Sequence, residues 1–366
     1  MLNLKPLLTI LKVTTTAAAL TWGYTTYVSA QSAEPAVAIA PADAQTTLIV
    51  NAADAFLASL SAEQREAVLF DWTDQTQRQN WSNFPQGGAG VVRAGLSWGD
   101  MTQDQRSATV ALLRAVLSED GVLNVLKQMA ADQVVAEAEA AGGADDSGRP
   151  PVSFGDAYYF ISFVGTPAPD QPWMLQFGGH HLAINATVVG ANVTLSPSLT
   201  GGEPLRITYE GSETRIAENE VTAGDDLLKS LDAGQLSKAV ISDTPANLVL
   251  GPGEDGSTVE AEGIAGADLN AGQKELLLAV IRSRLGILNA DDLAATMAPI
   301  EATLDQTTFG WWGPTEPLGA AYFRVTGPHV VIEFSPQAND GDATNHAHNI
   351  YRDPTNDYGA AWANLD

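Results

Sequence analysis

The chain has 366 residues, of which 45% are hydrophobic, with no cysteine and a formal net charge of −26. This length allows one large domain or two small ones with a real core, and the lack of cysteine excludes disulfide bonds and thiolate chemistry. The acidic excess repels phosphate backbones and anionic membranes, which excludes nucleic acid as a partner.

Residues 1–30 have the three parts of a cleavable secretory signal. Lys5 and Lys12 make the start positive, an apolar stretch interrupted by threonines covers 13–28, and small residues at 28–30 form the cleavage signal. A membrane-spanning helix needs ~20 mainly apolar residues, so we expect no stable membrane anchor after cleavage. We therefore expect a secreted or periplasmic protein.

Residues 31–48 are rich in Ala, Pro, Gln and Ser, and we expect them to be disordered ahead of a single α+β domain at 49–366. Four helix starts in this domain share one pattern, in which a capping residue is followed three positions later by Gln, and this is a capping box. Apolar residues with helical spacing follow at least three of them. The four caps are Ser61, Thr102, Asp232 and Asn270.

Strand-like runs, rich in aromatic and β-branched residues, follow the helices twice along the chain. We therefore predict helix pairs packed on antiparallel hairpins, an α+β fold, because the regular strand–helix alternation of parallel α/β proteins is missing. Two interpretations of the repeated order stay open: an internal duplication, with halves 49–200 and 201–366 around one site, and chance recurrence of a common unit. The runs are 158–164, 173–189, 322–326 and 330–334.

The chain has five histidines, and all of them lie in or beside the strand-like runs. His346 and His348 are two residues apart, so on a strand both imidazoles point to the same face and can bind one ion. Neutral imidazole nitrogen suits Zn, Cu, Fe or Ni. His180 and His181 are neighbours, so on a regular strand only one of them faces a given site, and which one stays open. His329 is the remaining candidate ligand.

These histidines indicate a transition-metal site of one of two kinds. Three histidines with an open position are typical of a catalytic zinc site, and a closed shell of four ligands is typical of a structural one. Glu333 is four residues from His329, on the same face of a strand, and is a candidate metal ligand or general base. The alternative is that each histidine is only a hydrogen-bonded strand residue.

Two charged residues directly follow the histidine pair of the C-terminal run. Arg352 can hold a carboxylate or phosphate with two parallel hydrogen bonds, so it is a candidate substrate anchor. Asp353 is a candidate for orienting a metal-bound imidazole or for acting as a base. The alternative is an Arg–Asp ion pair and an Asp-Pro turn that end the fold.

Residues 95–99 match G-x-S-x-G, the nucleophile elbow of serine hydrolases, with Ser97 as the nucleophile. An elbow needs a helix that opens directly after the serine, whereas here the next helix is expected to start at Thr102. A serine hydrolase that uses Ser97 and a later histidine is therefore the second alternative function.

Several sequence blocks are similar to a known family. Together they resemble the secreted family catalogued as domain of unknown function 3500, over nearly the whole mature chain. The resemblance implies export and a single family domain, and it implies no reaction. The family more often has Glu in place of Gly178 and has no fixed serine at position 97 or histidine at position 329. The blocks are Arg93-Ala-Gly-Leu96, Tyr158-Tyr159-Phe160, Gly179-His180-His181-Leu182, Gly202-Glu203-Pro204 and residues 345–359.

The sequence thus predicts an exported protein with a histidine-rich site for Zn, Cu or Fe. A metal-dependent hydrolase or oxidoreductase acting on a small molecule or peptide is one function that fits. A non-catalytic metal- or ligand-binding protein of the cell envelope is the other.

Overall fold

The first helix of the domain begins before the expected boundary at residue 48. In the computed structural model, α1 (Ala44–Ala58) starts at a capping box that Asp43 forms with Thr46. Thr46 is buried, so residues 44–48 of the expected disordered segment belong to the folded domain. The expected signal peptide, residues 1–30, lies outside the described residues, which are 39–142, 152–338 and 341–363.

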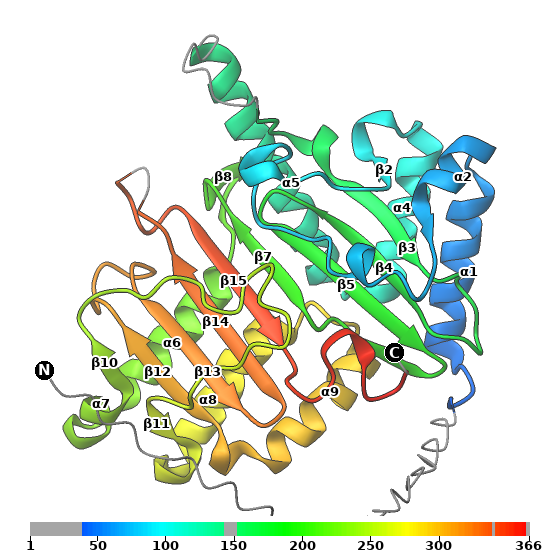
Figure 1. Ribbon diagram of the computed structural model, residues 1–366. Coiled ribbons are helices and arrows are strands. Elements are labelled where there is room, and N and C mark those ends of the chain that lie inside the picture. Colours follow the sequence, from blue (N-terminus) through cyan, green and yellow to red (C-terminus); the bar gives the residue numbers. More distant parts are fainter. Residues whose placement is uncertain (1–38, 143–151, 339–340, 364–366) are drawn as a thin grey trace, which may run out of the picture. The chain divides into compact units, whose positions relative to one another are not determined.

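The described chain is a mixed α and β structure built on one large mixed sheet (Figure 1). Neighbouring strands in it are antiparallel, except that β1 pairs with β3 and β10 with β12 in parallel. The order across the sheet is β1 (Leu69–Phe70), β3 (Phe160–Val164), β4 (Trp173–Gly179), β5 (Leu182–Val189), β7 (Ser198–Gly202), β15 (Ala347–Arg352), β14 (Val330–Pro336), β13 (Tyr322–Gly327), β12 (Thr308–Trp312) and β10 (Val240–Ser242). The short strands β2 (Leu96–Ser97), β6 (Asn192–Thr194) and β11 (Ile264–Ala265) pair with β3, β5 and β12, and β8 (Arg206–Tyr209) forms a separate ribbon with β9 (Ser212–Arg215).

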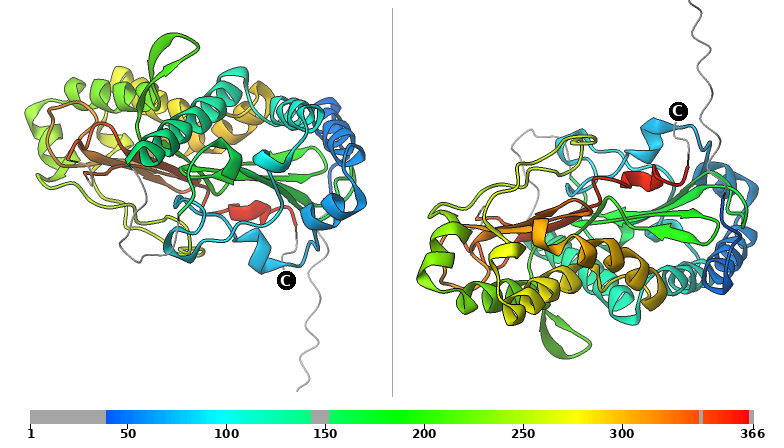
Figure 2. Two further views of the ribbon diagram at one scale, coloured as in Figure 1. Left: turned by 90° about the horizontal axis from the view of Figure 1, so that it is seen from above. Right: turned by 90° about the horizontal axis from the view of Figure 1, so that it is seen from below.

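The long helices lie along one face of the sheet (Figure 2). The two long connections, 71–95 and 243–263, and the C-terminal segment lie over the other face. All four predicted capping boxes are present. No helix among the described residues is both long and apolar enough to cross a bilayer. Besides α1, the helices are α2 (Ala62–Val68), α3 (Gln75–Arg78), α4 (Gln103–Val116), α5 (Glu119–Gly142), α6 (Glu218–Ser230), α7 (Ala233–Ala239), α8 (Ala271–Leu285) and α9 (Ala290–Ala302).

Two hydrophobic cores lie between the sheet and its helices. One joins α1, α4 and α5 to β3, β4 and β5, and its largest fully buried side chains include Phe56 and Trp173. The other joins α6 and α8 to β12, β13 and β14, with Phe309 and Phe334 at its centre. Burial of one such side chain stabilises the fold by about 1.5–3 kcal/mol, so each core holds its own part of the sheet.

The order of strands reads the same from both ends of the sheet. The series β1-β3-β4-β5-β7 matches β10-β12-β13-β14-β15, and β7 and β15 meet antiparallel at the centre. The registers match as well. Gln176 faces Asn185 between β4 and β5, and a constant shift in residue number carries this pair onto Arg324 and Glu333 between β13 and β14.

The helix contacts repeat in the same way. The Gln105 side-chain amide of α4 donates to the carbonyl of Ser59 at 3.1 Å. The Gln273 side-chain amide of α8 donates to the carbonyl of Ser230 at 2.9 Å. Each of these glutamines also closes the capping box of its own helix. The same residue types therefore make the same contacts in both parts of the chain.

Candidate metal centre

His180 and His181 form the tight turn between β4 and β5. Gly179 pairs with Leu182 across the turn, and His181 has a left-handed backbone with φ 60°. Gly179 is required there, because an added Cβ would lie 2.7 Å from the Tyr159 ring. The two imidazole centroids are 3.8 Å apart. The residues form a turn and not a regular strand, so both side chains line the same cavity, and His181 is the one of the pair that forms a close group with His346 and His348.

The turn brings His181 to the two histidines at the start of β15. His181 Nε2 lies 2.9 Å from His346 Nε2, and ring nitrogens of His181, His346 and His348 all lie within 4.8 Å of one another. All three side chains are buried. The meeting depends on the strand order, since β7 alone separates β5 from β15 in the sheet.

Three polar side chains from other elements surround the histidines. Asp132 of α5 accepts a hydrogen bond of 2.7 Å from His180 Nδ1. The Asn83 side-chain amide donates to His348 Nε2 at 3.1 Å. Glu203 Oε1 lies 3.3 Å from His346 Nδ1, and Glu203 also forms a second close group with His180 and His181.

Sequence reasoning did not find Asp132 or Asn83 as site residues. Asp132 lies in a long helix and Asn83 in a long connection, and neither stands in a pattern that indicates metal binding. Glu203 was part of a block that resembles the family, which was the only signal for it. It supplies a carboxylate beside the histidines, although Gly178 stands where the family more often has Glu.

Burial lowers the pKa values of two of the neighbouring imidazoles, those of His181 and His348. Burial first, and then the neighbouring histidine rings, hold the pKa of His181 well below its usual value. Burial, with the charges of His346 and His180, lowers the pKa of His348 to about 3. The contact with His346 lowers the pKa of Glu203. At neutral pH the site therefore offers lone pairs and a carboxylate, which are the forms that bind a metal ion.

The donor set fits a transition-metal ion. Zn–N bonds of about 2.0–2.1 Å place two ligand nitrogens about 3.3 Å apart in a tetrahedral site, so the 2.9 Å between His181 and His346 needs to open only slightly. His346 Nδ1 is buried and has no aligned hydrogen-bond partner. Asn83 Nδ2 lies 3.1 Å from His348 Nε2, so a metal ion bound by this nitrogen would take the place of the contact with Asn83.

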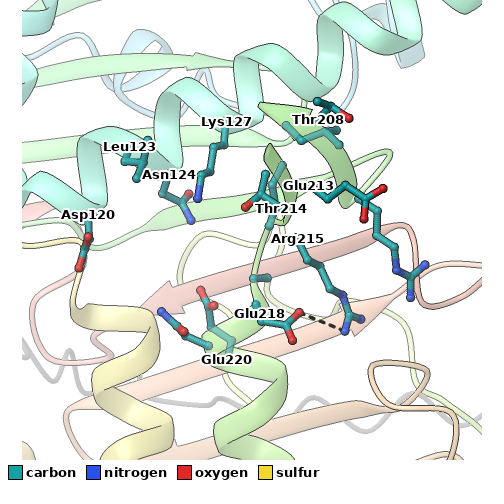
Figure 3. A pocket seen from close by; sticks show the side chains of 15 residues that line it. Asp120, Leu123, Asn124, Lys127, Thr208, Glu213, Thr214, Arg215, Glu218 and Glu220 are labelled. Atoms are coloured by element: carbon teal, nitrogen blue, oxygen red, sulfur yellow. Dashed lines mark hydrogen bonds and ion pairs between the residues drawn. The ribbon is translucent and has the colours of Figure 1, made fainter. Parts of the chain in front are cut away.

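A cavity of about 470 Å³ lies in front of the cluster. Its walls contain the four histidines of the cluster, which are His180, His181, His346 and His348. Glu203 and residues of both long connections, among them Phe84 and Leu248, also line it. Small-molecule sites have volumes of ≈ 300–1,000 Å³, so a small molecule can reach the imidazoles. A second cavity of about 880 Å³ lies between α5, the β8–β9 ribbon and the start of α6 (Figure 3). It shares no lining residue with the first.

Glu333 and Arg352 hold the second long connection in place. The Glu333 carboxylate accepts hydrogen bonds from the backbone N–H groups of Val249 and Leu250, at 2.8 and 2.7 Å, and from Tyr322 Oη. Arg352 Nε donates to the carbonyl of Leu250 at 3.0 Å. Glu333 is fully buried. It therefore positions a wall of the cavity and is not the ligand or base that the sequence suggested.

The remaining donors of Arg352 are also used. They bond to Asp255, Asp357 and the carbonyl of Gly251. Asp353 accepts from the backbone and side chain of Thr355, as in an ordinary turn. The ion-pair alternative for Arg352 thus describes its contacts, with Asp255 and Asp357 as partners, and Asp353 does not touch a clustered histidine.

The other two sequence candidates lie away from the cluster. His329 is in the turn between β13 and β14, where Nδ1 contacts Thr355 Oγ1 at 3.1 Å. Ser97 caps a short helical turn, and its hydroxyl donates to Asp100 at 2.6 Å. Within the described residues, no hydrogen bond joins Ser97 to a histidine. The arrangement of a nucleophile elbow is therefore not present.

Comparison with family models identifies the class of this protein. The model described as protein of unknown function (DUF3500) matches residues 42–360, so the chain belongs to this family. The match includes both halves of the sheet and every residue of the histidine cluster. No curated protein and no solved structure matches the chain.

Proposed function

We propose that this protein is a metal-dependent hydrolase, in which His181, His346 and His348 hold a transition-metal ion, with zinc as the first choice. The observation that carries the proposal is the convergence of three buried imidazoles on the wall of a cavity of about 470 Å³. A metal ion bound there would act as a Lewis acid and lower the pKa of a bound water to about 7.

Two groups beside the cluster are suited to moving protons. The Glu203 side chain is 32% exposed, so it reaches the cavity and can accept a proton from water. His180 is oriented by Asp132, and this carboxylate is itself fixed by the backbone N–H of Gly155 at 3.0 Å. An imidazole held by a buried carboxylate is an effective general base. Copper or iron in the same ligands would instead favour an oxidoreductase.

One observation favours a non-catalytic metal-binding protein as the second candidate. Glu203 lies close enough to join the three histidines as a fourth ligand, and a closed shell of four ligands is typical of structural sites. Azide added to the Co²⁺-substituted protein distinguishes the two functions. A change in the visible spectrum means an open coordination position, and an unchanged spectrum means a closed shell.

Metal content is the primary test. We expect purified wild type and His329→Asn to hold about one Zn²⁺ per chain, and His346→Asn/His348→Asn to hold none. With 4-nitrophenyl acetate as the probe, we expect zinc-loaded wild type to hydrolyse the ester faster than the double variant. A wild type that stays metal-free after incubation with Zn²⁺, Cu²⁺ and Fe²⁺ would refute the proposal.

We also propose that the protein is exported and that a small molecule or peptide is its substrate. The support for export is the signal-like composition of residues 1–30. N-terminal sequencing of protein from intact cells tests it. A mature chain that begins at Gln31 agrees with export, and a chain that keeps its N-terminus would contradict it.

We further infer that the two halves arose by internal duplication. The support is the mirrored strand order together with the matching registers and glutamine contacts. Chance recurrence of one unit does not require the same register in each pair of strands. Cutting the chain between Glu210 and Gly211, in the turn of the β8–β9 ribbon, tests whether the halves are separable units. Co-expressed pieces should reassemble and bind metal.

A further inference from the structure

Among the described residues, no Arg or Lys lines the cavity in front of the histidine cluster. Among its described lining residues, the charged groups apart from histidine are the carboxylates Glu203 and Glu254. A substrate that carries a phosphate or carboxylate is usually held by Arg or Lys. This cavity has no such group, and its carboxylates repel an anion.

Arg93 carries a positive charge that acts on His181, but it does not line this cavity. The side chain is buried, and Nη2 donates to the carbonyls of Ser82, Phe84 and Gly179 at 2.7–2.8 Å. Arg93 lines a different, internal cavity of about 20 Å³. It therefore holds the first long connection against the turn of the histidine pair and does not face the substrate cavity.

Apolar groups form the rest of the opening. The side chains of Phe84 and Val249 line the cavity and are 49% and 42% exposed, although both are large and hydrophobic. The Phe154 ring lies 5.3 Å from the His180 ring. Aromatic faces attract organic cations as well as apolar groups. These exposed surfaces are arranged to pack against an apolar part of a ligand.

The second cavity shows that the chain places basic groups elsewhere. Lys127, Arg206 and Arg215 line the cavity between α5 and the β8–β9 ribbon, with Glu213 and Glu218 beside them (Figure 3). The lack of positive charge is therefore specific to the cavity in front of the histidines. Lys127 offers a matched position for a control variant, because it lines a cavity that shares no residue with the substrate cavity.

We propose that the substrate is an uncharged or cationic organic molecule whose apolar part packs on Phe84 and Phe154 while its reacting group lies at the histidine cluster. Without a metal ion, the carboxylates of the walls disfavour molecules that carry a phosphate, sulfate or carboxylate. This inference rests on the proposed function for the reacting group, but the selectivity follows from the cavity walls and exists without a metal ion.

Binding of three small aromatic probes to the metal-free mature protein tests the proposal. The probes are benzyltrimethylammonium, benzyl alcohol and benzenesulfonate, and calorimetry or ligand-observed NMR measures their affinity. We expect the cation and the alcohol to bind at least about tenfold more tightly than the sulfonate, because one carboxylate within several ångströms contributes this much. Equal or tighter binding of the sulfonate would overturn the proposal, and so would no detectable binding of the cation and the alcohol.

Variants separate the contributions of the walls. Phe84→Ala should weaken the binding of the cation and of the alcohol to the same degree. Glu203→Gln/Glu254→Gln should reduce the affinity of the cation to that of the alcohol, and Lys127→Gln should change neither. An unchanged affinity in Phe84→Ala would overturn the role of this wall. If the probes show the expected order but the wild type never binds metal, the proposed hydrolase fails and the ligand selectivity stands.

Discussion

The two hairpin turns of the sheet occupy matching positions and have different roles. The turn between β4 and β5 carries His180 and His181, next to the histidines of β15. The turn between β13 and β14 carries Pro328 and His329, and its histidine contacts only the side chain of Thr355 among the described hydrogen bonds. The fold therefore has two hairpin turns at matching positions, and only the residues of the turn between β4 and β5 contribute to the histidine site.

The strands behind these turns differ in a similar way. In the first half Gln176 donates to the carbonyl of Arg78 and so holds the connection 71–95 with a neutral amide. In the second half the equivalent Arg324 donates to the carbonyl of Glu260 and to the carboxylate of Glu262 in the connection 243–263, beside the buried carboxylate of Glu333. Matching backbone positions thus hold matching loops with uncharged groups in one half and charged groups in the other.

The largest effect on stability is expected when the buried carboxylate of the second half is removed. Glu333→Ala leaves two backbone N–H groups and Tyr322 Oη without their partner and should lower the free energy of unfolding by about 3–5 kcal/mol. The equivalent Asn185→Ala removes a bond to the carbonyl of Pro197 and one accepted from Gln176, and it should cost about 1–2 kcal/mol. Urea unfolding of both variants measures the difference. Equal losses of stability would show that the carboxylate of Glu333 does not hold its loop more strongly than the amide of Asn185 holds its own.

The second largest effect is expected on zinc affinity, which should depend on the histidine of the turn between β4 and β5 and not on that of the turn between β13 and β14. We expect His181→Asn to weaken zinc binding at least about hundredfold, or ~2.7 kcal/mol, because it removes one of three ligands. Asn tolerates the left-handed backbone at this position, so the turn should persist. The matched His329→Asn should bind zinc like wild type. A loss of affinity in His329→Asn would place the second turn in the site as well.

Acid should destabilise the metal-free protein through the two buried histidines with lowered pKa values, His181 and His348. The folded pKa values of His181 and His348 lie below the unfolded value of ≈ 6.5, so the unfolded chain binds more protons. Stability is then complete above pH 6.5 and falls as the pH drops, by up to about 1.4 kcal/mol per pH unit and histidine. Unfolding midpoints between pH 7 and 5 measure this, and His348→Gln should reduce the slope. A flat profile would contradict neutral buried imidazoles.

The smallest effect tests the likeness of the two halves. Gln105→Ala and Gln273→Ala each remove a capping-box partner and a bond to a helix-end carbonyl. Each should cost about 1–2 kcal/mol. Thermal unfolding of the two variants should give similar shifts. A large difference between them would show that these equivalent contacts no longer have equivalent roles.

Local signals were readable in the sequence. The capping boxes at Ser61, Thr102, Asp232 and Asn270 were predicted correctly, because a cap depends on residues within one helical turn. The family resemblance is confirmed by the match over residues 42–360. These features depend on neighbours in the chain, so composition and spacing are sufficient to find them.

The composition of the site was decided by the tertiary structure. Spacing predicted that His346 and His348 share a face, but only the strand order β5-β7-β15 brings His181 to them. Asp132 and Asn83 reach the cluster from a helix and a long connection that no local pattern relates to it. Glu333 and Arg352, which resembled catalytic residues, bind a loop instead. Contacts between residues far apart in the chain depend on strand order and packing, and short-range patterns do not record either.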